Sequence, residues 1–232
     1  MKKIISSRLL TFLCAIGGGV TGVLRLWFLN TGVDNRGLLI TDHPGNILSF
    51  VLTAVVTLSC ILLMPKEKTY PLSSGNQSKV AAVIGGVGCA AVSIPLLGNG
   101  LLPTVTGFLG IVAALCALVM MFTKPTPLLR CVSIVFLLLL PLHLYRQWSR
   151  QPQLPLYFFD LLGSVCLLLW AYQRTALETV GGNEKICLLM SRLGVFFCTA
   201  AVAGSEQSIF FVCGAAWMLL DSIAKDGSHD AS

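Results

Sequence analysis

Charged side chains are scarce in this sequence. They make up only 11% of the 232 residues, whereas a soluble domain carries about 25%. A water-soluble chain with so little charge could not cover its own surface, and 55% of the residues are hydrophobic. The scarcity of charge therefore excludes an ordinary soluble domain and predicts a chain surrounded by the lipid bilayer. The net charge of +6 is small and spread along the sequence, which is typical of a membrane protein and argues against nucleic acid as a partner.

The sequence also lacks the common motifs of enzymes. It contains no Gly-x-Ser-x-Gly elbow, no His-Glu-x-x-His motif, no nucleotide-binding glycine loop and no pair of adjacent glutamates of the kind that intramembrane metalloproteases use. We therefore predict no catalytic residue, no cofactor and no metal site, and we expect a protein that is not an enzyme.

Cysteine is plentiful, but its pattern is not that of a disulfide framework or a zinc site. All nine cysteines fall inside apolar runs, and no Cys-x-x-Cys occurs. Disulfide frameworks and zinc sites need closely spaced, accessible thiols. We interpret the cysteines as small, polarizable residues that pack between helices.

Long apolar runs fill the chain. A membrane-spanning helix needs about 20 mostly apolar residues, and eight segments approach this length, of which the last is short and could lie partly in the interface. They are Leu9–Leu29, Gly45–Met64, Val80–Leu97, Leu101–Phe122, Leu128–Tyr145, Leu156–Tyr172, Ile186–Ala203 and Ser208–Leu220. Because only helices satisfy their own backbone groups in lipid, the predicted fold is an all-α polytopic transmembrane bundle of about eight spans.

The basic residues predict the orientation. If the N-terminus is cytoplasmic, 12 of the 16 lysines and arginines lie at or near the inside. The four on the outside are Arg25, Arg36, Arg146 and Arg150. This bias favours cytoplasmic termini. The aromatic residues agree with two interfacial belts, in which Trp27 and Tyr145 lie at outer ends of helices, and Trp170 and Trp217 toward inner ends.

The whole chain, residues 1–232, is expected to form a single integral membrane domain. Residues 1–8 and 222–232 would be short cytoplasmic tails, and the apolar run after Leu9 is too long for a cleaved signal peptide. Similar short segments in the two halves, such as Leu24–Trp27 and Leu142–Tyr145, are consistent with a parallel repeat of four helices, as some transporters have. Such matches also arise by chance in sequences rich in Leu, Ala and Val.

Three polar residues form a candidate intramembrane cluster. Arg25 lies about four residues before the outer end of the first predicted helix, Asp160 about four residues after the outer start of the sixth, and His143 near the same level on the fifth. Ionisable residues within a span cost about 2.5–3.5 kcal/mol on insertion scales, so they usually face protein or water. We predict that Arg25 and Asp160 pair and line a cavity open to the outside. In the alternative, Arg25 reaches the outer headgroups and Asp160 meets the interface.

Other outer residues have simpler explanations. His143 could relay a proton or bind a ligand, but a histidine near Tyr145 is more often an interfacial residue. Arg146 and Arg150 share a helical face and could attract an anion, although lipid phosphate is the favoured partner.

The loop between the first two predicted helices is polar. Asp34, Asn35 and Asp42 could supply oxygen ligands to calcium, yet their spacing matches no EF-hand-like loop. A turn followed by a helix cap from Asp42 or His43, with Pro44 in the first turn, is the favoured interpretation.

Small residues mark faces where helices approach closely. Gly18 and Gly22 form a Gly-x-x-x-Gly motif in the first predicted helix, and Gly85, Gly86 and Gly88 crowd the third. Close backbone approach between helices explains both groups. Local unwinding around a substrate is the less favoured alternative.

The first two predicted helices carry a loose resemblance to a known group of sequences. The first helix ends in Arg25-Leu26-Trp27, and Thr31, Asp34, Gly37-Leu38-Leu39 and His43 precede the second. This pattern resembles a family of small, uncharacterised polytopic membrane proteins of anaerobic Gram-positive bacteria. The resemblance covers about a quarter of the chain. It implies the bacterial cytoplasmic (inner) membrane and gives no activity or substrate.

Two classes of function remain open. A small-solute transporter, or the membrane subunit of one, would have a water-filled cavity between the first, fifth and sixth predicted helices, lined by Arg25, Asp160 and His143. An accessory or structural membrane protein that binds partner helices, or a second copy of itself, would instead be a tightly packed bundle with those side chains at the outer rim.

Overall fold

The computed structural model describes residues 2–32, 40, 43–64, 76–98, 100–123, 126–148 and 157–223. Within these ranges all the long elements are helices and no strand occurs. The helices are α1 (Lys2–Thr31), α2 (Pro44–Leu62), α3 (Asn76–Ser93), the 3₁₀ turn η1 (Ile94–Leu96), α4 (Leu101–Phe122), α5 (Pro127–Trp148), α6 (Phe158–Thr179), α7 (Glu184–Val202) and α8 (Ser208–Ile223). The predicted all-α bundle is therefore confirmed.

Membrane-spanning character is clear for most of these helices. Six are long and apolar enough to cross a membrane, namely α1 from Leu9, α2, α3 with η1, α4, α5 and α7. The chain is thus an integral, multi-pass membrane protein. The helix α8 is apolar but shorter, and α6 is as long as α4 and α5 but carries charges at both ends. Whether α6 and α8 also cross the membrane stays a prediction.

Several predicted boundaries differ from the structure. The helix α1 already begins at Lys2, so most of residues 1–8 is helical rather than a tail, and α8 continues through Ser222. The helix α6 runs seven residues beyond the predicted end at Tyr172, because the charged residues that ended the apolar run are paired inside the protein. By contrast, α4 spans Leu101–Phe122 as predicted.

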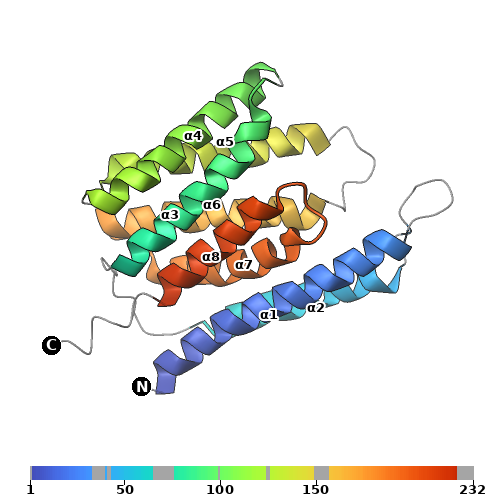
Figure 1. The fold of residues 1–232 in the computed structure, drawn as a ribbon. Coiled ribbons are helices and arrows are strands. Elements are labelled where there is room, and N and C mark those ends of the chain that lie inside the picture. Colours follow the sequence, from blue (N-terminus) through green and yellow to red (C-terminus); the bar gives the residue numbers. More distant parts are fainter. Residues whose placement is uncertain are drawn as a thin grey trace.

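Six of the helices form a closed ring. Each helix from α3 to α8 packs against the next one in sequence, and α3 packs back against α8. The hairpin of α1 and α2 lies outside this ring and rests mainly on α7 (Figure 1). The helices α6 and α7 pack closely, whereas α2 and α3, their counterparts in a four-helix repeat, are not close neighbours among the described residues. The two halves therefore do not share one packing pattern.

Glycine faces explain how the helices approach one another. A Cβ on Gly18 would meet the Thr199 hydroxyl and the Phe196 carbonyl of α7, and a Cβ on Gly22 would meet Ala203 at 3.2 Å. The predicted Gly-x-x-x-Gly packing face of α1 is thus confirmed, and its partner is α7.

The glycines of α3 serve two neighbours. A Cβ on Gly85 would collide with the Trp217 ring of α8, and a Cβ on Gly86 would lie 2.8 Å from the Ala117 Cβ of α4. The predicted packing role of these glycines is also confirmed, because α3 is wedged between α4 and α8.

Side chains fill the interior of the bundle. Buried residues from α1 to α8 form one continuous core, in which Phe136 and Phe196 are fully buried. Trp170 is 2% exposed and meets Trp217 edge to face, with ring centroids 5.1 Å apart. The prediction that these two tryptophans belong to an interfacial belt is wrong for Trp170, since tertiary packing between α6 and α8 buries it.

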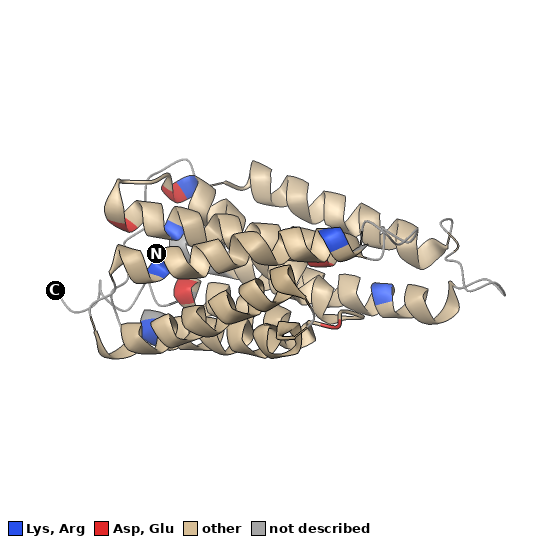
Figure 2. Ribbon diagram, turned by 90° about the horizontal axis from the view of Figure 1, so that it is seen from above, with Lys and Arg blue, Asp and Glu red and all other residues tan. Residues whose placement is uncertain are grey.

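The described charges lie toward the two ends of the bundle (Figure 2). The first residues of α1 and the last residues of α8 are at the same end (Figure 1), which agrees with two termini on one side of the membrane. That this side is the cytoplasm stays a prediction.

Candidate functional site: ion pairs at both ends of α6

Arg25 and Asp160 form a buried ion pair. Arg25 Nη1 donates to Asp160 Oδ1 at 2.8 Å, and the two side chains are 5% and 4% exposed. The pair joins α1 to α6 across the end of α7. Of the two alternatives for these residues, the structure has the paired one, with both side chains buried inside the protein.

The surroundings of the pair satisfy both charges. Asp160 lies in the first turn of α6, where the helix dipole stabilises a carboxylate. The Arg25 guanidinium also approaches the Ala201 carbonyl at 3.5 Å and lies 5.7 Å from the centroid of the Phe159 ring. Because Ala201 is in the last turn of α7, its carbonyl has no partner within that helix. Arg25 thus compensates a carboxylate and a helix C-terminus together.

A turn after α7 completes this site. Gly204 has a φ of 82°, a left-handed conformation that glycine adopts at little cost. The turn places Ser205 and Glu206 near the Asp160 carboxylate, close enough for both residues to act on it electrostatically. We call the pair of Arg25 and Asp160 the α1–α6 lock.

His143 is not part of the α1–α6 lock. It is half-buried on α5, and the charged group that acts on it is Arg146, one turn further along the same helix. Among the described residues, no hydrogen bond or ion pair joins His143 to Arg25 or Asp160. The structure thus brings together two of the three predicted cluster residues, and the functional role of the cluster stays a prediction.

The cavity expected between the first, fifth and sixth predicted helices has no counterpart in this packing. The helix α1 lies against α7 and α2, and in the described part of the chain it is not a close neighbour of α5.

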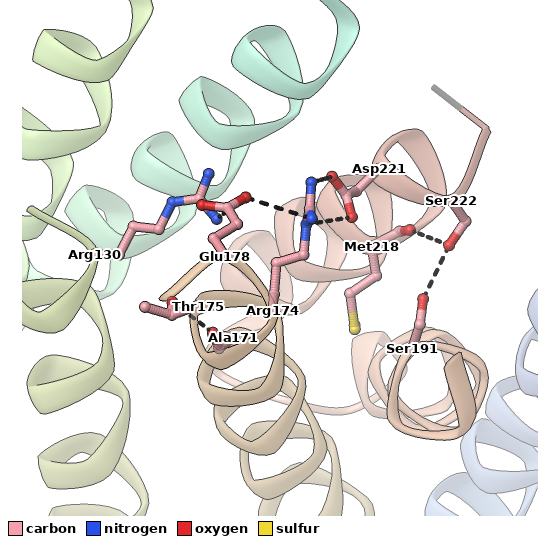
Figure 3. Close-up of polar contacts among 9 residues, drawn as sticks. All are labelled: Arg130, Ala171, Arg174, Thr175, Glu178, Ser191, Met218, Asp221 and Ser222. Atoms are coloured by element: carbon pink, nitrogen blue, oxygen red, sulfur yellow. Dashed lines mark hydrogen bonds and ion pairs between the residues drawn. The ribbon is translucent and has the colours of Figure 1, made fainter. Parts of the chain in front are cut away.

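A second group of charges lies at the opposite end of α6. Arg130 Nη1 of α5 is 2.9 Å from Glu178 Oε1 of α6, and Arg174 Nη1 is 3.4 Å from the same oxygen. Arg174 Nε is 3.1 Å from Asp221 Oδ2 of α8, and its Nη2 donates to Asp221 Oδ1 at 3.4 Å (Figure 3). We call these four residues the α5–α6–α8 lock.

The α5–α6–α8 lock lies at one end of the six-helix ring and joins three of its helices. Arg174 and Asp221 are 3% and 4% exposed, whereas the side chains of Arg130 and Glu178 are about a fifth exposed. Beside it, the hydroxyls of Ser191 and Ser222 are 3.0 Å apart, which links α7 to α8 (Figure 3). Two positive and two negative charges are thus balanced in a chain from α5 to α8.

Sequence reasoning missed the α5–α6–α8 lock. It counted Arg130 and Arg174 among basic residues near the cytoplasm and ended the sixth helix before Glu178. The available signals were the four-residue spacing of Arg174 and Glu178, which puts both on one helical face, and a lone acid, Asp221, directly after an apolar run.

The residues directly before α2 provide its N-terminal cap. His43 caps α2, since its Nδ1 accepts a hydrogen bond from the Gly45 amide at 3.2 Å, and Pro44 occupies the first turn. The predicted cap by His43 is confirmed. Asp34, Asn35 and Asp42, which we considered as calcium ligands, lie outside the described residues, as does Arg150. No group of three or more His, Cys, Asp or Glu side chains gathers to hold a metal among the residues described.

Comparisons with models of known protein families, with curated proteins and with solved structures found no match to this chain. The functional inference therefore depends on the geometry of the two locks alone.

Proposed function

We propose that this protein is a small-solute transporter, or the membrane subunit of one, in the bacterial cytoplasmic membrane. Its solute would pass through the ring of α3 to α8. The observation that carries the proposal is that α6 has a buried ion pair at each end, one to α1 and the other to α8. The described conformation is a closed one, because side chains fill the ring.

Energetics supports a working role for these charges. Inserting a charged residue into a bilayer costs about 2.5–3.5 kcal/mol on insertion scales. Replacing a buried ion pair by well-packed apolar residues is often neutral or stabilising by about 1–4 kcal/mol. A bundle that only had to be stable would therefore gain little from two charged locks.

Ion pairs differ from apolar contacts in one property that transport needs. When a helix end moves and water enters, the separated charges are hydrated, so the open state is not prohibitively costly. An α1–α6 lock and an α5–α6–α8 lock that open in turn would expose the ring interior to one side and then to the other. This model needs no substrate charge, and it names no particular solute.

Cysteine accessibility tests the proposal without knowledge of the solute. Leu167 of α6 is 1% exposed and approaches Gly214 of α8, whereas Leu169, two residues along, is 40% exposed on the outside of the bundle. Each is replaced by cysteine in a background in which all nine native cysteines are removed. Intact cells and inverted vesicles are then treated with hydrophilic methanethiosulfonate reagents of either charge.

The two positions give opposite expectations for a transporter. Cysteine at position 167 reacts because water reaches the ring interior in the open states. Cysteine at position 169 stays unreacted because it faces lipid. Absence of labelling at position 167 from both sides would refute the transport proposal.

The accessory alternative draws on a different observation. Only Gly45, Ser49, Thr53 and Cys60 of α2 are buried, and apolar side chains such as Val51 and Val55 are exposed on its outer face. Lipid or a partner helix could cover that face. An accessory protein would show no labelling at position 167, because the ion pairs of both locks would stay formed and would only stabilise the bundle.

A further inference from the structure

Three helices meet at a buried pair of thiols outside both locks. Cys14 Sγ of α1 and Cys60 Sγ of α2 are 3.4 Å apart, and the two residues are 2% and 0% exposed. The two cysteines are 46 positions apart in the sequence, so a search for closely spaced cysteines does not find the pair. Cys14 and Cys60 thus place two thiols in contact within the hairpin of α1 and α2.

A buried cation lies beside the two thiols. Arg192 of α7 is 2% exposed and is the largest of the fully buried side chains. Its guanidinium is close enough to interact electrostatically with both sulfurs. A neighbouring positive charge favours the thiolate, which is the reactive form of cysteine.

We propose that Cys14 and Cys60 form an oxidisable pair that a small peroxide converts into a disulfide between α1 and α2. The Cys60 thiolate attacks one peroxide oxygen, the O–O bond breaks, and the departing hydroxide takes up the proton that Cys60 released. The product is a sulfenic acid at Cys60 and one water.

The second step closes the disulfide. The Cys14 sulfur attacks the Cys60 sulfur, the S–O bond breaks, and the departing hydroxide takes the Cys14 proton to give a second water. Overall, two thiols and one hydrogen peroxide yield one disulfide and two waters. The thiols are oxidised and the peroxide oxygens are reduced, so no further reactant is needed.

The position of the pair provides a route for a small oxidant. The hairpin of α1 and α2 lies outside the six-helix ring (Figure 1), and α2 buries only four of its residues. An element with so few buried contacts opens locally at a lower free energy than the core. Hydrogen peroxide can therefore reach the thiols without unfolding the ring.

The chain contains other neighbouring thiols that lack this arrangement. Cys89 and Cys213 interact electrostatically across α3 and α8, and so do Cys166 and Cys198 across α6 and α7. No arginine is among the groups that act on Cys89 or Cys198. Among the described residues, neither of these pairs has the direct Sγ–Sγ contact that joins Cys14 to Cys60, so they test whether burial near another thiol is enough for oxidation.

The test uses the full-length protein purified in detergent and fully reduced. It is treated with hydrogen peroxide over time, free thiols are alkylated with N-ethylmaleimide after denaturation, and proteolytic peptides are analysed by mass spectrometry. We expect a cross-linked peptide pair containing Cys14 and Cys60, with Cys89, Cys166 and the other cysteines still alkylated. In Cys14→Ser, a dimedone adduct at Cys60 should replace the cross-link.

The arginine is tested separately. Arg192→Gln should slow formation of the cross-link at least tenfold, whereas Arg192→Lys, which keeps the charge, should slow it much less. If Arg192→Gln does not fold, the experiment on the wild-type protein still tests whether Cys14 and Cys60 form the disulfide selectively. The proposal is overturned if all nine thiols remain alkylated, or if Cys89 and Cys213 become cross-linked as fast as Cys14 and Cys60.

Discussion

Exchanging the charges of the α1–α6 lock tests the pairing of Arg25 and Asp160. In Arg25→Asp the new carboxylate faces Asp160, and in Asp160→Arg the new guanidinium faces Arg25. Both original side chains are at most 5% exposed, so water cannot compensate the unpaired charge. Breaking a buried pair in this way costs about 3–5 kcal/mol. Such a loss reduces the ratio of folded to unfolded protein by a factor of about 100 or more.

The double variant, Arg25→Asp with Asp160→Arg, restores opposite charges across the same gap. We expect it to recover at least half of the stability that either single variant loses. In the assay, purified protein in one detergent is heated, and the fraction that stays folded is measured by fluorescence-detected gel filtration. For a chain of this size, a loss of about 3–5 kcal/mol lowers the melting temperature by about 10 °C.

A charge reversal elsewhere provides the control. Arg146 on α5 is exposed, and exposed ion pairs contribute at most about 1 kcal/mol, so Arg146→Asp should change the melting temperature little. If the double variant is as unstable as the single variants, the pairing of Arg25 with Asp160 does not contribute to the fold in the way the structure indicates.

Three further predictions concern packing, the second lock and topology. Gly18→Ala should destabilise the protein by about 1–3 kcal/mol, because the new Cβ would collide with α7. In the same thermal assay, Gly19→Ala should have no effect on stability, because a Cβ at that position meets nothing within 4 Å. Equal effects of the two substitutions would contradict the packing of α1 on α7. Arg174→Gln should reduce stability more than Arg130→Gln does, because Arg174 is much more buried and its loss leaves a buried carboxylate unpaired. A larger loss of thermal stability in Arg130→Gln than in Arg174→Gln would be inconsistent with the α5–α6–α8 lock. Single cysteines in the loop Thr31–His43 should react with impermeant reagents from outside the cell, and labelling only in inverted vesicles would reverse the proposed orientation.

The fold was largely predictable because apolar runs dominate the chain. Lipid leaves helices as the main solution for an apolar segment, and the bounds of α4 follow directly from its sequence. The sixth helix was predicted too short, because Arg174 and Glu178 end the apolar run while their pairing inside the protein lets the helix continue. Hydropathy reports the solvent that a residue would prefer, and it contains no information on which partner a charge finds.

The candidate site was predictable only in part. Arg25 and Asp160 stood out because each is a lone charge at the same depth near a helix end. His143 satisfied the same depth criterion, yet depth does not specify the direction in which a side chain points around the bundle. The pairing of Cys14 with Cys60 depends on α1, α2 and α7 meeting, a packing choice that no local pattern in the sequence encodes.

The most direct test of the transport proposal combines the α1–α6 lock with access to the ring. The apolar double variant Arg25→Leu with Asp160→Leu should remain folded, since apolar replacement of a buried pair is often tolerated, but its apolar contact should not open to water. The reporter is a single cysteine at position 167 in the background without native cysteines. We predict that it reacts with an impermeant reagent from outside when Arg25 and Asp160 are present, and that it is unreactive in the apolar double variant. Equal reactivity in the two proteins would contradict the claim that this ion pair controls access to the ring interior.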